Sequence, residues 1–310
     1  MENEKKYPIY IMLFLVMVAW GFNVIATKVI VMAFPPIMVT SFRILVAGVC
    51  VFIILSFLQQ VRLPSKREGF FIFWGALFNV LGHQYFISIA LTQTTATNAG
   101  LILGMGPLLT TILAIIFLGN RLNGIRLIGI LLGLMGVFFI ILQNGRISGL
   151  SIGDVNAFIS ILSMAISFII IKKAATSLDP RLMTAYMLVI GAIFLFIVSL
   201  LTEPNALQQM GNGTLNLWLL FWGSAILSTA LGHMFYNYGI GKVGAAEAAI
   251  FTNLSPFFAV VGAVVFLHEA LSISQIIGFM FIVLGVILGS GAYEEIQKGR
   301  KRKRNVGVLE

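Results

Sequence analysis

Long apolar runs constrain this chain more than any other feature of its sequence. They are about 18 to 24 residues long, which is the length that a helix needs to cross the hydrocarbon core of a bilayer. The runs do not alternate apolar and polar residues as barrel strands would, so helices are the form that satisfies their backbone groups in lipid. Hydrophobic residues make up 59% of the 310 residues, and charged residues only 10%. The sequence therefore predicts an all-α polytopic membrane protein.

Ten such runs can be placed along the chain, and each predicts one transmembrane helix. The turns near residues 92–95 and 241–244 are so short that the helices on either side must form hairpins. The first run is too long for a signal peptide and lacks a small-residue cleavage site, so we expect it to be retained as a helix. The runs cover approximately residues 8–30, 36–58, 70–90, 95–118, 124–142, 152–174, 181–201, 215–238, 244–267 and 272–292.

Lysine and arginine are distributed unevenly between the loops. Of the 20 Lys and Arg residues, Lys28 and Arg146 fall on one side, Arg43 falls inside a run, and the other 17 fall on the side of the N-terminus. The positive-inside rule then assigns both termini to the cytoplasm. The net charge of +9 needs no nucleic acid to explain it. The basic tail over residues 294–310 either contacts anionic lipid headgroups or acts as a topology anchor.

The second half of the chain repeats the first. Leu81-Gly82-His83 recurs as Leu231-Gly232-His233, and Pro107 falls on Pro256. Weaker matches extend the repeat upstream, where residues 28, 36 and 40 meet residues 172, 180 and 184. An odd number of predicted helices, five, separates each feature from its copy, so the two halves must cross the bilayer in opposite directions. Inverted repeats of this kind characterise secondary transporters.

Two repeat units and a tail are therefore expected. The first unit covers residues 1–145, with helices one to five, and the second covers residues 146–293, with helices six to ten. The tail over residues 294–310 follows.

The chain resembles the drug/metabolite transporter superfamily in its EamA-like branch. The resemblance implies ten helices made from two five-helix repeats, and it extends over nearly the whole chain. This sequence departs from the family pattern at Asn120, where the family has a glutamate. The residues that carry the resemblance are Trp20-Gly21, Asn23, Lys28, Phe42-Arg43, Thr95 to Ala99, Gly106-Pro107, Phe117-Leu118-Gly119, Gly153-Asp154, Ala245 to Ala248, Ser255-Pro256 and Leu267 to Leu271.

The paired histidines His83 and His233 are the first candidates for substrate binding, because ionisable residues at bilayer depth usually face a cavity or a partner. His233 shares a helix face with Tyr236 and Asn237, three and four residues later. These groups could line a central pathway and bind a polar solute. Alternatively, each imidazole could simply bond to the backbone of a neighbouring helix.

Glu247 is the acidic residue placed most clearly within a predicted span, and its mate in the repeat is Asn98. Its carboxylate could bind an amine or carry a coupled proton, or it could merely favour the first turn of its helix. Trp20, Asn23 and Asn98, which carry the resemblance, join the candidate substrate-binding residues. Arg43 could attract a substrate carboxylate, snorkel to the interface, or pair with Glu247 or a helix C-terminus.

Pro107 and Pro256 are candidate hinges. Each removes a backbone hydrogen bond from an apolar helix, so matched kinks would suit a rocking mechanism, although a static kink is the alternative. The patterns Gly129-x3-Gly133 and Gly285-x3-Gly289 predict close helix contacts, either within one chain or across a homodimer.

Signatures of enzymes are missing from the sequence. There is no phosphate-binding Gly-x4-Gly-Lys loop and no Gly-x-Ser-x-Gly elbow, and no acidic residue or Cys accompanies the histidines at metal-ligand spacing. We therefore expect no catalytic residues, no cofactor and no metal.

The expected function is a secondary carrier in the plasma membrane. It would export or exchange small metabolites, such as amino acids or related amphiphiles, by alternating access. Its partners would be the small-molecule substrate and membrane lipids. The rival functions are a passive channel and an intramembrane enzyme acting on lipids.

Overall fold

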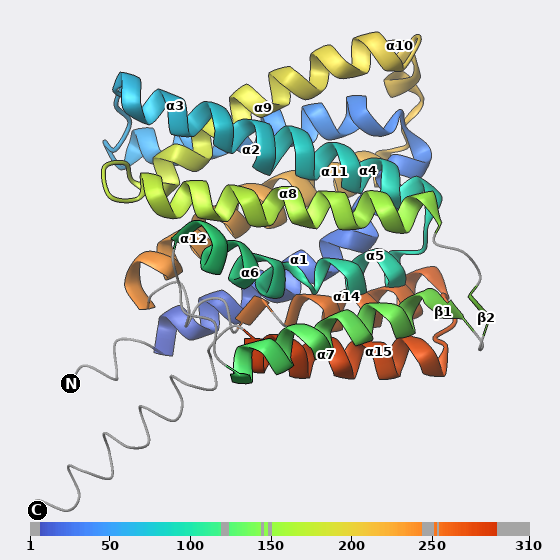
Figure 1. The fold of residues 1–310 in the computed structure, drawn as a ribbon. Helices are drawn as coiled ribbons and strands as arrows, with labels where there is room; N and C mark the ends of the chain where they lie inside the picture. The colour runs from blue at the N-terminus through green and yellow to red at the C-terminus, as the bar shows by residue number, and fades with distance from the viewer. Residues whose placement is uncertain are drawn as a thin grey trace, which may run out of the picture.

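The computed structural model describes residues 7–118, 124–143, 146–147, 151–243, 251–252 and 254–289. Within these ranges the chain forms a bundle of helices that run back and forth along one direction, with one very short strand pair at an end of the bundle (Figure 1). The candidate Glu247 and the tail 294–310 lie outside the described residues.

The helices and strands follow one another in this order: α1 Tyr7–Ala33, α2 Pro36–Phe57, α3 Lys66–Gly75, the π-helix η1 Ala76–Gly82, α4 His83–Gln93, α5 Ala96–Leu103, α6 Gly106–Leu118, α7 Gly124–Ile141, β1 Leu142–Gln143, β2 Arg146–Ile147, α8 Ile152–Ala174, α9 Pro180–Thr202, α10 Ala206–Gln209, the 3-10 helix η2 Met210–Asn212, α11 Leu215–Gly223, the π-helix η3 Ser224–Leu231, α12 Gly232–Val243, α14 Leu254–Leu267 and α15 Ile273–Gly289. β1 and β2 pair antiparallel.

The prediction of a helical, polytopic membrane protein is confirmed. In the part of the chain that the structure describes, seven helical segments are long and apolar enough to cross a membrane, and three apolar helices are shorter. The predicted hairpin at residues 92–95 is present, since α4 ends at Gln93 and α5 begins at Ala96. Ten spans and cytoplasmic termini stay predictions.

Local sequence signals explain where the helices begin. Ser65 and Ser151 each form a capping box with the acidic residue three positions later, which satisfies free N–H groups at the start of α3 and α8. Pro36 and Pro180, which the repeat aligns, each occupy the first position of a helix, where a missing N–H costs nothing. Matched residues therefore start matched helices.

The helices pack in pairs that correspond between the two halves. α2 packs against α9, and α7 packs against α15, which lie side by side in Figure 1. α1 contacts α12 and α14, while α8 contacts α4 and the pair α5 and α6. Exchanging α1 for α8, α4 for α12 and α6 for α14 turns the contacts between them into one another, and most of the segment that matches α5 lies outside the described residues.

Glycines allow the α7–α15 pair to approach closely. A Cβ atom added at Gly285 would lie 2.6 Å from the backbone N of Gly133, and one added at Gly136 would lie 2.6 Å from the carbonyl O of Gly278. The predicted close contacts thus occur within one chain.

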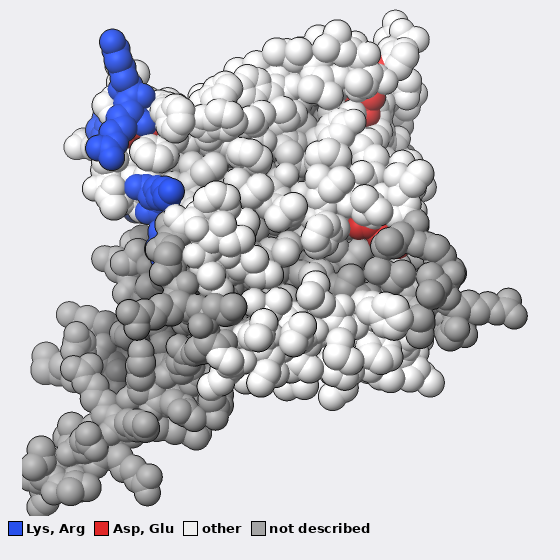
Figure 2. Space-filling model, viewed as in Figure 1, with Lys and Arg blue, Asp and Glu red and all other residues white. Residues whose placement is uncertain are grey.

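Charged side chains gather at the two ends of the bundle. Figure 2 shows the Lys and Arg atoms at one end and most of the visible Asp and Glu atoms towards the other. The exposed basic residues at this end lie after α2, in the first turn of α3 and in the last turn of α8: Arg62, Lys66, Arg67, Lys172 and Lys173. At this end Glu68 holds the pKa of Arg62 above its usual range, chiefly through a side-chain hydrogen bond. We call this end the basic end. The opposite end, where α2, α5 and α8 begin, is called the clamp end after the carboxylate contacts described below.

Candidate substrate-binding site

A π-helical turn precedes each of the two matched histidines. η1 leads directly into His83, and η3 ends two residues before His233. π-helical turns are rare and often occur at functional sites, because the extra residue rotates the following side chains and releases backbone carbonyls from the regular pattern. The repeat therefore extends beyond matching residue types to a matching irregularity of the backbone.

The histidines use one ring nitrogen each to hold their position. Nδ1 of His233 lies 2.8 Å from the carbonyl O of Thr229, and since a carbonyl only accepts, Nδ1 carries the proton. Nδ1 of His83 lies 2.7 Å from Oγ of Ser160, whose own hydroxyl donates to the carbonyl of His83 at 2.9 Å. In both rings Nε2 is left as an acceptor.

Aromatic rings pack against His233. The Trp20 ring centroid lies 5.0 Å from the centroids of both His233 and Tyr236, and its Nε1 donates to the carbonyl of Ser228 at 2.9 Å. The predicted shared face of His233 and Tyr236 is thus present, with Trp20 of α1 against it. The Asn237 side chain lies outside the described residues.

Arg43 is the buried cation of this region, with a relative exposure of 3%. Its guanidinium donates to Oε1 of Gln84 at 2.8 Å, to Oγ of Ser224 at 3.3 Å and to Oγ1 of Thr229 at 3.2 Å. The hydroxyl of Ser224 in turn donates to Oδ1 of Asn23 at 2.5 Å. The network joins α1, α2, α4 and η3, and it places the predicted residue Asn23 beside the arginine. The snorkelling alternative for Arg43 is wrong, because its partners are buried within the bundle.

Sequence reasoning missed four partners of these residues: Gln84, Ser160, Ser224 and Thr229. Each is an ordinary polar residue in an apolar helix, and its importance arises from helices far apart in the chain. Gln84 alone had a usable signal, because it follows His83 directly.

Asn98 belongs to a separate polar group at the clamp end. Its Nδ2 donates to Asp154 at 3.4 Å, and its Oδ1 accepts from Nε2 of Gln275 at 2.7 Å. The hydroxyl of Thr94 donates to the same carboxylate oxygen of Asp154 at 2.6 Å. The backbone carbonyl of Thr94 accepts from Nζ of Lys28, also at 2.6 Å. The amide of Asn98 therefore ties helix ends together, and the structure does not bring it into the Arg43 network.

At the clamp end, the carboxylate of Glu203, which directly follows α9, binds the start of α2. Its two carboxylate oxygens accept from the backbone N–H groups of Ile37 and Met38, both at 2.8 Å, and the hydroxyl of Ser199 donates to one of them at 2.5 Å. A carboxylate at a helix N-terminus is stabilised both by these bonds and by the helix dipole.

Glu269, after α14, repeats this arrangement at the start of α5. It accepts from the backbone N–H groups of Ala96 and Thr97, both at 2.9 Å. The preceding residue, His268, has a φ of 53°, and this left-handed conformation ends α14 and turns the chain back. We call the Glu203 and Glu269 contacts the two carboxylate clamps, because each joins the second half of the chain to the first.

The candidate hinges occupy matching places. Pro107 is the second residue of α6, and residues 104–105 interrupt the helical run between α5 and α6. Pro256 is the third residue of α14. A Cβ at Gly104 would lie 2.8 Å from Cγ of Pro256, so the interruption in one half packs against the proline of the other. Pro107 lies in a first helical turn, where the ring is tolerated.

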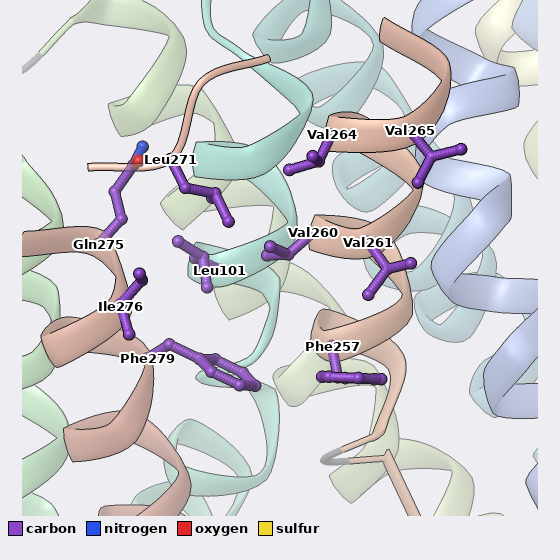
Figure 3. A pocket seen from close by; sticks show the side chains of 10 residues that line it. All are labelled: Leu101, Phe257, Val260, Val261, Val264, Val265, Leu271, Gln275, Ile276 and Phe279. Atoms are coloured by element: carbon purple, nitrogen blue, oxygen red, sulfur yellow. The ribbon is translucent and has the colours of Figure 1, made fainter. Parts of the chain in front are cut away.

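An apolar groove of about 330 Å³ opens between α5, α14 and α15 (Figure 3). Gln275 is the polar one of its ten lining residues, and its amide already bonds to Asn98. The groove therefore suits apolar chains better than a polar solute. No three His, Cys, Asp or Glu side chains come together as a metal site in the ranges that the structure describes.

Comparison with known proteins identifies the family. The model of the EamA-like transporter family matches residues 7–142 and 151–291. The chain belongs to this family. The EamA-like chain is 29% identical over 293 residues to YyaM of Bacillus subtilis (strain 168), named an uncharacterized transporter, with 93% of this chain and 95% of that protein covered. It is 27% identical to YvbV of the same organism, also named an uncharacterized transporter, with 93% of each covered.

A solved crystal structure shares the fold of this EamA-like chain. The TM-score is 0.65 at 21% sequence identity, and the match covers 93% of this chain and 98% of the other. The resemblance to the drug/metabolite transporter superfamily is therefore confirmed, and the names of the family and its relatives are those of transporters and not of enzymes. The roles of the individual site residues stay predictions.

Proposed function

We propose that this chain is a secondary transporter that moves small polar metabolites across the plasma membrane by alternating access. Amino acids and related amphiphiles are the expected substrates, and export or exchange is the expected direction. The protein would cross the membrane ten times as two inverted repeats, with both termini in the cytoplasm and the clamp end outside.

One observation carries this proposal: a polar network is buried between helices of both halves. Arg43, Gln84 and Asn23 come from the first half, and Ser224 and Thr229 from the second. Polar groups are costly at bilayer depth, so a network of this kind is expected where a solute passes and not in a passive scaffold. Any rocking of one half against the other would change the contacts around Arg43.

The matched packing of the two halves supports alternating access. Each half supplies a π-helical turn before its histidine and a proline in the matching helix, Pro107 in α6 and Pro256 in α14. Two halves with near-equivalent contacts can exchange their arrangements, which converts a site open to one side into a site open to the other. A channel would need no such exchange.

Counterflow in proteoliposomes tests the proposal. Vesicles that contain the purified protein are loaded with an unlabelled mixture of L-amino acids, and the uptake of each labelled amino acid is followed. A carrier gives uptake that saturates with concentration and is accelerated by the same solute inside the vesicle. Protein-free vesicles serve as the control.

Two results would contradict the carrier mechanism. Flux that rises linearly with concentration, with no acceleration by internal solute, would indicate a channel. Modification of vesicle lipids without flux of any solute would indicate an enzyme.

A further inference from the structure

We infer that Arg43 binds the anionic group of the transported solute, and that this solute is a small organic monocarboxylate. The inference rests on the proposed transport function and adds to it the chemical class of the substrate and the residue that selects it.

Among the residues that the structure describes, none of the groups that hold Arg43 balances its charge. Its hydrogen-bond partners Gln84, Ser224 and Thr229 are all neutral. Two arginines at the basic end are ion-paired instead: Arg62 lies 2.6 Å from Glu68, and Arg181 lies 2.8 Å from Asp179. A charge buried in a membrane protein is costly, and it is normally paired or functional. Arg43 is thus expected to find its counterion in something that binds there.

The guanidinium of Arg43 has more N–H groups than its described acceptors use, and this suits bidentate recognition. An arginine has five N–H groups in a planar fork that matches a carboxylate, and here the neutral acceptors take three hydrogen bonds. Those acceptors come from two other helices and orient the plane of the guanidinium. They stabilise the position of the cation without neutralising it, which is the arrangement expected of a preformed anion site.

Acceptors beside Arg43 suit the rest of the solute. His233 bonds to the carbonyl of Thr229, whose hydroxyl accepts from Arg43. His83 directly precedes Gln84, another acceptor of Arg43. Their Nδ1 protons are used by Ser160 and Thr229, so each Nε2 can accept a hydrogen bond from an amino or hydroxyl group.

A monocarboxylate fits better than a phosphate ester. A phosphate carries up to two charges, and it would need a second cation. The other described Lys and Arg side chains are engaged elsewhere: Lys28 bonds to Thr94 at the clamp end, and the exposed ones lie at the basic end. One buried guanidinium matches one carboxylate.

The test uses full-length protein in detergent and a panel of matched ligands. The panel contains L-amino acids, lactate and benzoate, each with its primary carboxamide, which keeps the shape and removes the charge. Ligand binding is measured as the rise in melting temperature and as Kd, and ligands that bind are then tested for counterflow. The variants are Arg43→Gln, Arg62→Gln as a matched loss of an arginine outside the site, and Glu247→Gln.

We expect at least one carboxylate to stabilise the wild type and its carboxamide not to. Arg43→Gln should raise the Kd of that carboxylate about 10- to 150-fold, which corresponds to the net loss of one hydrogen bond to a charged group. Arg62→Gln should leave the Kd unchanged. Without ligand, Arg43→Gln should melt no lower than the wild type, because it removes a buried charge whose partners among the described residues are all neutral.

Several outcomes would overturn the inference. Equal binding of a carboxylate and its amide, or unchanged Kd in Arg43→Gln, would remove the anion site. Destabilisation by Glu247→Gln that Arg43→Gln reverses would mean that the two residues pair within the protein. If the whole carboxylate panel fails while a neutral or cationic solute shows saturable counterflow, the substrate class is wrong and the transport function stands. If no solute shows counterflow, both proposals fail.

Discussion

Removing one carboxylate clamp should open the clamp end of the protein. In Glu269→Gln the side chain keeps one acceptor oxygen and gains an NH2 group, so only one of the N–H groups of Ala96 and Thr97 keeps its bond. A hydrogen bond to a charged group contributes about 1.5–3 kcal/mol, and a carboxylate at a helix N-terminus about 0.3–1 kcal/mol. Because water reaches the freed N–H once the end opens, we take roughly 2 kcal/mol as the net loss.

That loss translates into a change of population. If the clamp is made only in the closed state, roughly 2 kcal/mol shifts the ratio of open to closed protein by about 30-fold. The Glu203 clamp holds another helix and shares no residue with the first. The two losses should therefore add, and the double variant should shift the ratio by roughly a thousandfold.

The assay follows the reactivity of a buried cysteine beside the clamp. Thr97→Cys is made in a Cys50→Ala background, because Thr97 is 1% exposed and should react only when the clamp end opens. Labelling by a membrane-impermeant maleimide should accelerate by about 30-fold in Glu269→Gln, in line with the shift in population. Met38→Cys, at a side chain with 0% exposure, reports the Glu203 clamp in the same way.

A matched control separates clamp opening from general loosening. Glu68→Gln removes a carboxylate that caps its own helix through Ser65, away from the clamp end, and should leave labelling at position 97 unchanged. Equal labelling rates with and without Glu269, or equal acceleration by Glu68→Gln, would refute the reasoning.

Three further predictions follow from the same structure. Cysteines at Gln93 or Gly211 should be labelled by impermeant reagents outside intact cells and one at Ser65 should not; the reverse pattern would overturn the orientation. His83→Ala and His233→Ala should each lower substrate affinity without loss of folding or insertion, whereas unchanged saturation kinetics in both would assign the rings to packing. Gly285→Ala should lower the free energy of unfolding by about 1–3 kcal/mol, because the added Cβ overpacks against α7. Gly69→Ala should not lower it, since an added Cβ there meets nothing within 4 Å, and thermal unfolding of the two variants tests the difference.

The positions of the helices could be predicted because each helix depends on residues that are close together in the sequence. Runs of apolar residues mark the spans. The structure shows local start signals as well, which are the capping boxes of Ser65 and Ser151 and the prolines Pro36 and Pro180. The repeat also predicted matched histidines, and the structure adds a matched π-helical turn before each. That turn could not have been predicted, because nothing in the residues of η1 or η3 distinguishes it from an ordinary apolar helix.

The binding site was predicted only in part because it is assembled across the chain. Trp20, His233 and Tyr236 could be expected at one place, since two share a helix face and the third carries the family pattern. The partners of Arg43 lie 41, 181 and 186 residues away along the chain. Asn98 illustrates the opposite case: its repeat partner Glu247 drew attention to it, but helix-end contacts with Asp154 and Gln275 use its amide.

The two carboxylate clamps also connect the proposed substrate site to the clamp end. The Glu203 clamp holds the first turn of α2, and Arg43 lies on the same helix, less than two turns further along. A helix transmits motion along its length, so an anion that draws Arg43 towards the second half would also press the start of α2 towards Glu203. In the repeat, Glu203 and Glu269 fall on Gln59 and Asn120, which carry no charge. At these positions, only the second half supplies carboxylates that can bind the other half. We therefore expect substrate binding to favour closure at the clamp end more strongly than at the basic end.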